Sequence, residues 1–88
     1  MDQLPEIEFR YNQNIYKVQL EALKSSNIAC YGYLKKEQMF VIKFNNGGYY
    51  LYLGVPEELE GQFRVATSKG RFYYLFIKNK YEGHKLDI

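Results

Sequence analysis

Two groups of side chains in this sequence have the residue types and the spacing to bind a nucleic acid. The first is the run Ser68-Lys69-Gly70-Arg71, in which a helix-capping serine precedes two cations and a small glycine. Free amides at a helix N-terminus, a hydroxyl group and two cations together favour an anion. The alternative is a capping serine followed by solvent-exposed charges, because serine caps are common. The run therefore predicts a phosphate contact, with the capping role as the alternative.

The second group is a row of tyrosines on one side of an expected strand. Tyr50 and Tyr52 are two residues apart, so in an extended chain their rings point to the same side. The strand before it carries Lys43, which we expect close by. Aromatic rings beside a lysine on an open sheet face stack unpaired bases and attract phosphate. The alternative is that a helix or the N-terminal segment covers this face and the tyrosine hydroxyls are bonded internally.

The sequence contains few candidates for catalytic residues. His84 is the single histidine and lies in the polar segment Glu82-Gly83-His84-Lys85, where we expect it to be solvated. The glutamates of residues 57–60 fit the positive end of a helix rather than an acid/base pair. Cys30 stands among apolar residues and is expected to be a small buried side chain. With no phosphate-binding glycine motif and no metal-ligand spacing, we expect no enzyme, no cofactor and no metal site.

Length and composition bound the remaining choices. The chain has 88 residues, enough for one small domain, and it contains ten tyrosines and six phenylalanines. Its net charge is only +2, but residues 61–88 hold six basic and two acidic groups, so the C-terminal third is mildly basic. One cysteine excludes an internal disulfide, and no apolar run reaches the length of a membrane span. We therefore expect a cytoplasmic protein without membrane contact.

The elements that must position the two candidate groups follow from the apolar pattern. Residues 6–10 and 15–20 alternate polar and apolar side chains around the turn Asn12-Gln13-Asn14, which predicts a β-hairpin. A helix over residues 17–24 is the competing interpretation, because its leucines also fit helical spacing.

The rest of the chain reads as strands followed by helices. Residues 28–34 and 39–44 predict a second hairpin, and the turn before residue 49 leads to a strand over 49–54. Pro56 suits the first turn of a helix, and a second helix is expected over residues 69–81. In that second helix, helical spacing puts Phe72, Leu75, Phe76 and Asn79 on one face. The helix is apolar over more than half its girth, so it is either sandwiched in the core or part of an interface. The predicted fold class is α+β: an antiparallel sheet of three to five strands followed by two short helices packed on it.

An ordered set of residues in the middle of the chain is specific enough to indicate a family. The set is Ser25-Ser26, Ile28, Gly32-Tyr33, Phe44, Gly48, Tyr50-Leu51-Tyr52, Val55-Pro56, Ala66, Ser68-Lys69-Gly70, Phe72, Ile77 and Tyr81. On these residues, 25–82 resemble the KTSC domain, which is named for its occurrence at the C-terminus of some lysyl-tRNA synthetases and is also found alone in bacteria and phages. Residues 1–24 are then an N-terminal addition, and 83–88 a polar C-terminal tail. The chain departs from the family at Leu34 and Tyr74, where aspartate and asparagine are frequent.

The resemblance implies RNA binding through the family's association with a tRNA synthetase. We accordingly predict a non-enzymatic binding module for RNA or single-stranded nucleic acid. The alternative is a small oligomeric interaction protein, including a phage-encoded one that binds a host protein or a signalling nucleotide. The predicted binding residues are Tyr50, Tyr52, Lys43, Arg64, Ser68, Lys69, Arg71, Tyr74 and Lys78.

Overall fold

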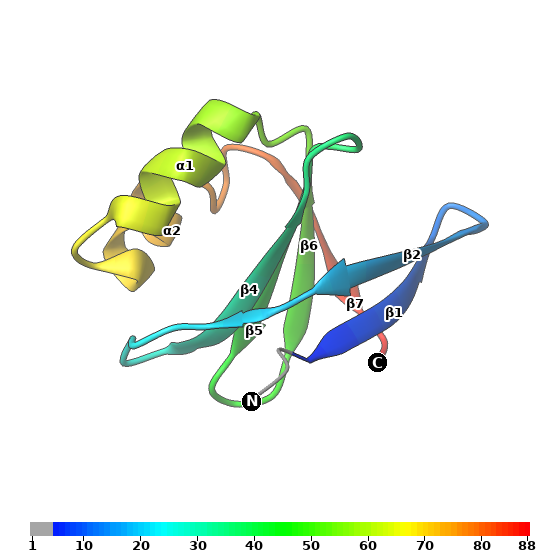
Figure 1. Cartoon of the computed structure of the whole chain (residues 1–88), viewed down its shortest axis with the longest axis horizontal. Coiled ribbons are helices and arrows are strands. Elements are labelled where there is room, and N and C mark those ends of the chain that lie inside the picture. The colour runs from blue at the N-terminus through cyan, green and yellow to red at the C-terminus, as the bar shows by residue number, and fades with distance from the viewer. Residues whose placement is uncertain (1–4) are drawn as a thin grey trace.

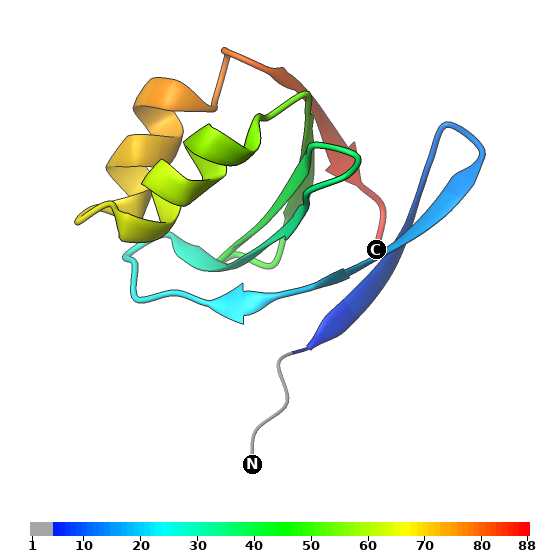
Figure 2. The same ribbon diagram turned by 45° about the horizontal axis from the view of Figure 1, so that its top comes forward.

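A five-stranded antiparallel sheet forms the middle layer of the fold, with two helices on one side and a β-hairpin on the other (Figures 1 and 2). The computed structural model describes residues 5–88. The elements in chain order are β1 (Glu6–Tyr11), β2 (Asn14–Gln19), β3 (Glu21–Ala22), β4 (Ile28–Leu34), β5 (Met39–Phe44), β6 (Tyr49–Leu53), α1 (Glu57–Val65), α2 (Lys69–Phe76) and β7 (Glu82–Leu86). The prediction of an α+β fold with an antiparallel sheet and two helices is confirmed.

The sheet has the order β3-β4-β5-β6-β7, and every neighbouring pair is antiparallel. Its register places Ile42 between Tyr31 and Tyr50, and Phe40 between Tyr33 and Tyr52. Because side chains alternate along a strand, these aromatic and aliphatic groups share one face of the sheet. That face is the one that the helices cover.

Two apolar clusters fill the spaces between the three layers. On the helix side, Phe63 of α1 and Tyr73 of α2 pack with Ile77 against the sheet residues Tyr31 and Phe40. On the hairpin side, the sheet contributes Cys30, Met39, Val41, Leu51 and Leu86, and these pack under Phe9, Val18 and Leu20. The structure therefore places a β-hairpin, and no helix, over residues 6–19; of the predicted addition, residues 1–4 lie outside the described part of the chain.

The chain after Phe76 differs from the prediction in two ways. α2 ends at Phe76 instead of continuing to residue 81, and Asn79 adopts a left-handed backbone (φ 66°) within the turn that follows. That turn reverses the chain, so residues 82–86 pair with β6 as strand β7 and Leu86 is buried. The prediction of a polar tail over 83–88 is wrong, because pairing with an open sheet edge orders a segment whose side chains are mostly polar.

The packing face of α2 also differs from the expected one. Tyr73 is buried in the helix and Ile77 just after it, whereas Leu75 and Phe76 are 42% and 49% exposed. Within residues 5–88, neither helix is long and apolar enough to cross a membrane.

Candidate nucleic-acid interface

The first predicted group lies at one end of a groove beside the start of α2, which we call the polar end. A hollow of about 310 Å³ is bounded by the loop before β4 and by the first turn of α2. Ser68 caps the helix, because its hydroxyl accepts a hydrogen bond from the Arg71 amide at 3.3 Å. The Lys69 ammonium donates to the Ala66 carbonyl at 2.6 Å and keeps further N–H donors, since an ammonium has three. The polar end is lined by Lys24, Ser25, Ser26, Asn27, Thr67, Ser68, Lys69, Gly70 and Arg71.

The second predicted group lies at a neighbouring hollow of about 380 Å³, which we call the aromatic end. Tyr74 is its most open ring, 64% exposed, and the Lys78 ammonium lies 5.5 Å from the centre of that ring. Tyr50 is half-buried and packs edge-on against Phe44, with ring centres 5.5 Å apart. The aromatic end is lined by Asn27, Phe44, Asn46, Tyr50, Tyr52, Gly70, Tyr73, Tyr74 and Lys78.

Asn27 and Gly70 border both hollows, so the polar and aromatic ends are adjacent, and we treat them together as one groove. The Asn27 side chain packs directly on Gly70: a Cβ at position 70 would lie 2.5 Å from its Oδ1 atom. Ser25 donates to that same oxygen at 3.1 Å, and the Asn27 carbonyl accepts from the Asn45 amide at 2.9 Å. The loop before β4 is thus tied to the loop after β5, and together they set the width of the groove at its middle.

The electrostatic character of the groove is uniformly basic. Four cations line it: Lys24, Lys69, Arg71 and Lys78. No carboxylate is among the described residues that border either end. A concave surface with cations of one sign raises the local concentration of an anionic ligand. The arrangement can therefore hold phosphates at the polar end and place a base against the ring at the aromatic end.

The floor of the aromatic end is a pair of buried tyrosines whose hydroxyls are hydrogen-bonded to each other. Tyr52 and Tyr73 are each 6% exposed, and their rings meet edge-on with centres 5.6 Å apart. Burial raises the pKa of both phenols above its ordinary value, and the hydroxyl of Tyr52 adds to the rise at Tyr73. The predicted stacking role does not fit Tyr52, because its ring faces are packed against protein and a base has no access to them.

Two predicted residues lie away from the groove. Lys43 points to the hairpin side of the sheet, opposite to the face of Tyr50, and its ammonium lies 5.3 Å from the ring centre of Tyr49. The prediction failed because adjacent residues of a strand alternate between faces, and Ile42 is the one that accompanies Tyr50.

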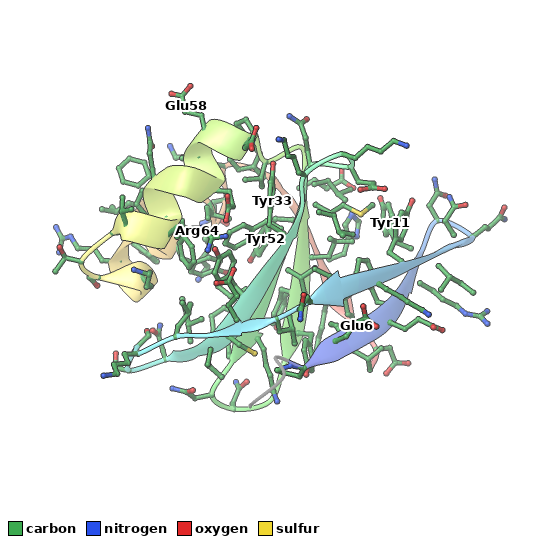
Figure 3. All side chains as sticks on the ribbon, viewed as in Figure 1. Glu6, Tyr11, Tyr33, Tyr52, Glu58 and Arg64 are labelled. Atoms are coloured by element: carbon green, nitrogen blue, oxygen red, sulfur yellow. The ribbon has the colours of Figure 1, made fainter. Side chains whose placement is uncertain are left out.

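Arg64 is held by carboxylates away from the groove. Its side chain comes from α1 and is labelled in Figure 3. It donates to Glu21 at 3.1 Å and to Glu60 at 2.8 Å, and its guanidinium lies 5.7 Å from the ring centre of Tyr31. The hydrogen bond to Glu21 raises the pKa of Arg64 further, so its charge is fixed and neutralised in place. Glu60 is itself buried and accepts the Tyr31 hydroxyl at 2.8 Å. This cluster supports α1 on the sheet, and a phosphate would have to compete with two carboxylates to reach Arg64.

Sequence reasoning missed Asn27, Asn46 and Lys24 as groove residues. All three belong to loops that come next to α2 only through the pairing of β4 with β5 and of β5 with β6. The one local signal was the polar run 25–27, which reads as a turn. Within residues 5–88, no three side chains among His, Cys, Asp and Glu lie together in a way that could hold a metal ion.

Comparison with known proteins identifies the middle of the chain. Residues 24–81 match the family model described as the KTSC domain. A protein of Tsukamurella paurometabola is 34% identical over 62 residues, which cover 70% of this chain and 92% of that relative. A crystal structure of a KTSC domain protein from Yersinia pestis has a TM-score of 0.77 at 40% identity, and the match covers 80% of this chain and 99% of that one.

Much larger proteins contain a similar segment. Lysine–tRNA ligases of Nostoc punctiforme and Trichormus variabilis are 33% and 32% identical over 63 residues. The match covers 72% of this chain and 11% of each ligase.

Proposed function

The chain belongs to the KTSC domain family, and from that premise we propose that it is a non-enzymatic binding module for single-stranded RNA. The observation that carries the proposal is the convergence of four cations, an open tyrosine ring and exposed amide side chains on one groove without a bordering carboxylate. RNA without a complementary strand is bound in this manner, through a basic surface along the backbone and aromatic rings for the bases.

The relatives give the proposal a second support. Proteins named lysine–tRNA ligase carry a segment similar to this chain, and such an enzyme acts on an RNA. The domain occurs within these ligases and also in short proteins of its own length, as expected of a domain that adds RNA binding. The proposal gives this chain the same class of ligand. We place the protein in the cytoplasm, where its free buried thiol Cys30 stays reduced.

The proposal assigns a role to each part of the groove. Lys69 and Arg71 neutralise one or two phosphates at the polar end, which the first turn of α2 borders. Lys78 holds the next phosphate along the strand, and a base stacks on the face of the Tyr74 ring that Lys78 does not cover. Asn27 stands at the junction, where its amide reaches a base edge or a sugar hydroxyl.

The test is a fluorescence-anisotropy titration of a labelled single-stranded RNA with the full chain and with the double variant Arg71→Ala/Lys78→Ala. If Lys69, Arg71 and Lys78 each neutralise one phosphate, the affinity falls about 20-fold between 50 and 200 mM salt. The double variant retains one such contact, so its affinity falls only about threefold over the same range.

The matched control removes the same charge elsewhere. Lys17 and Lys36 are exposed and outside the groove, so Lys17→Ala/Lys36→Ala keeps the wild-type salt dependence. Equal loss of affinity in both double variants would contradict the proposal, because net charge alone would then explain binding.

A second candidate function rests on the apolar end of α2. Leu75 and Phe76 are exposed, and the Phe72 and Phe76 rings are in contact with centres 4.8 Å apart. Such a group of exposed apolar side chains is typical of a protein-contact surface. This candidate makes the chain an oligomeric or partner-binding protein, and Phe76→Ser would then weaken association while RNA binding is unchanged.

A further inference from the structure

The face of the sheet that lies under the β1–β2 hairpin is apolar and buried. Cys30, Met39, Val41 and Leu51 come from three adjacent strands, and each is at most 8% exposed. They are covered by side chains of the β1–β2 hairpin, of which Phe9 and Val18 are 1% and 2% exposed. An apolar face of this kind is not left open to water in a stable protein. It therefore needs a cover, and in this chain residues 5–20 supply it.

The cover lies outside the segment that the family shares. The family match begins at residue 24 and includes the apolar face but not Phe9, Val18 or Leu20. The relative of T. paurometabola is matched over 62 residues that make up 92% of it, so only a few residues lie beyond the match. A chain that short cannot contain both a counterpart of residues 24–81 and a counterpart of the hairpin with its connection. That relative therefore has no room for such a hairpin, and a second copy of the chain is the cover that we consider for the corresponding face.

The hairpin is attached to the domain as a separate unit. β1 pairs only with β2 in the described strands, and β2 is joined to β3 through the single residue Leu20 (Figure 2). At the other side, a hollow of about 400 Å³ separates β1 from the end of β7. A contact of 3.5 Å between the Tyr11 hydroxyl and His84 spans these two elements. Side-chain packing, with little backbone pairing, holds the cover in place.

The cover and the sheet approach each other closely at Gly32. A Cβ at this position would lie 2.6 Å from the Val18 side chain and 2.7 Å from the Gln19 carbonyl oxygen. The backbone of β2 thus crosses β4 at a point where only glycine leaves room. A larger residue there would push the hairpin away from the sheet, because a backbone carbonyl cannot turn aside as a side-chain end can.

We propose that the β1–β2 hairpin is a tethered partner: it occupies an association face of the domain and keeps this chain monomeric through that face. When the hairpin is displaced, two copies pair through Cys30, Met39, Val41 and Leu51, sheet against sheet. This inference concerns the face opposite to the RNA groove and does not depend on the proposed function.

The test uses the full chain with the double variant Phe9→Asp/Val18→Asp, which spoils the cover and leaves the face intact. Ile15→Asp is the matched control, since Ile15 lies in the same hairpin and is 56% exposed. Sedimentation equilibrium gives the mass, trypsin cleavage after Arg10 or Lys17 reports hairpin opening, and circular dichroism reports the fold. We expect the double variant to be cleaved in the hairpin and to double its mass from 10.5 kDa, while the control stays uncleaved and monomeric.

Each other result contradicts the inference. A cleaved monomer would show that the exposed face does not pair. An uncleaved monomer would show that Phe9 and Val18 do not hold the hairpin in place. Loss of the whole fold would show that the hairpin is an integral layer. The variant Gly32→Val opens the hairpin from the sheet side, so its cleavage at Arg10 with the domain still folded checks that last outcome independently.

Discussion

An alanine at position 70 would place a methyl group where the two ends of the groove meet. Its Cβ would lie 2.5 Å from Asn27 Oδ1, and both other side-chain atoms of the amide group are within 3.5 Å. The Asn27 side chain is exposed and can rotate, so the contact is relieved by moving it into the groove or away from its Ser25 partner. Gly70→Ala therefore alters the groove without disturbing the core.

The expected change in stability is small because two terms oppose each other. Replacing glycine by alanine inside a helix stabilises it by about 0.5–1 kcal/mol, and the gain is smaller at the second residue of a helix. Loss of the exposed Ser25–Asn27 hydrogen bond costs about 0.5–1.5 kcal/mol. The free energy of unfolding is then within about 1 kcal/mol of wild type, which for a domain of this size moves Tm by at most about 8 °C.

The expected change in binding is larger. With the junction narrowed, a strand cannot lie in both ends at once, and we expect the Kd for single-stranded RNA to rise about tenfold, equivalent to about 1.4 kcal/mol. Gly61→Ala is the control: its Cβ meets nothing within 4 Å, so Tm rises by about 2–8 °C and the Kd is unchanged. Anisotropy titration and thermal unfolding measure both quantities. Wild-type affinity in Gly70→Ala would refute the view that the two hollows act as one groove.

Three further predictions concern the buried tyrosines. Tyr52→Phe and Tyr73→Phe each leave one buried hydroxyl without its partner and lower the free energy of unfolding by about 1–3 kcal/mol. The double variant loses less stability than the sum of the two single losses, because it leaves no unpaired hydroxyl. Urea unfolding measures all three variants, and additive losses would contradict the pairing. Burial raises the pKa of Tyr31 and Tyr73 above the ordinary value of 10.0, so their neutral forms stabilise the fold fully below pH 10 and this stabilisation is lost as the pH rises from 10 through the folded-state pKa. Urea unfolding at pH 8, 10 and 11 should show that decline, and a flat profile would argue against it. Gly83→Ala places a Cβ 2.7 Å from the ring of Tyr52 and lowers the free energy of unfolding by about 1–3 kcal/mol. If the midpoint of urea unfolding does not change, this prediction is wrong.

The sequence predicted the parts of the fold that local periodicity determines. Both hairpins and strand β6 lie where alternation placed them, and Ser68 caps α2 as expected. β7 was missed because Glu82, Gly83 and Lys85 carry no strand signal, and only the open edge of β6 makes them a strand. The packing face of α2 was missed because the helix is apolar over more than half its girth, so periodicity does not say which side meets the sheet.

The residues of the candidate site could likewise be predicted where they are neighbours in sequence, and not where strand pairing or tertiary contacts place them. Ser68, Lys69 and Arg71 are neighbours in sequence, and they line the polar end together. Lys43 was wrongly placed because the face of a residue depends on strand register, and Arg64 because its acidic partner Glu21 is 43 residues away in sequence. Asn27 carries no motif of its own, and its place at the junction depends on how two loops meet α2.

The most direct test of the central claim is an NMR titration of the ¹⁵N-labelled full chain with a short single-stranded RNA at low salt. We predict that the amide shifts concentrate in residues 24–27 and 68–78, which border the groove, and that the hairpin residues 6–19 stay unchanged. Shifts confined to the hairpin side, or no shifts at millimolar RNA, would contradict the assignment of this groove as an RNA-binding site.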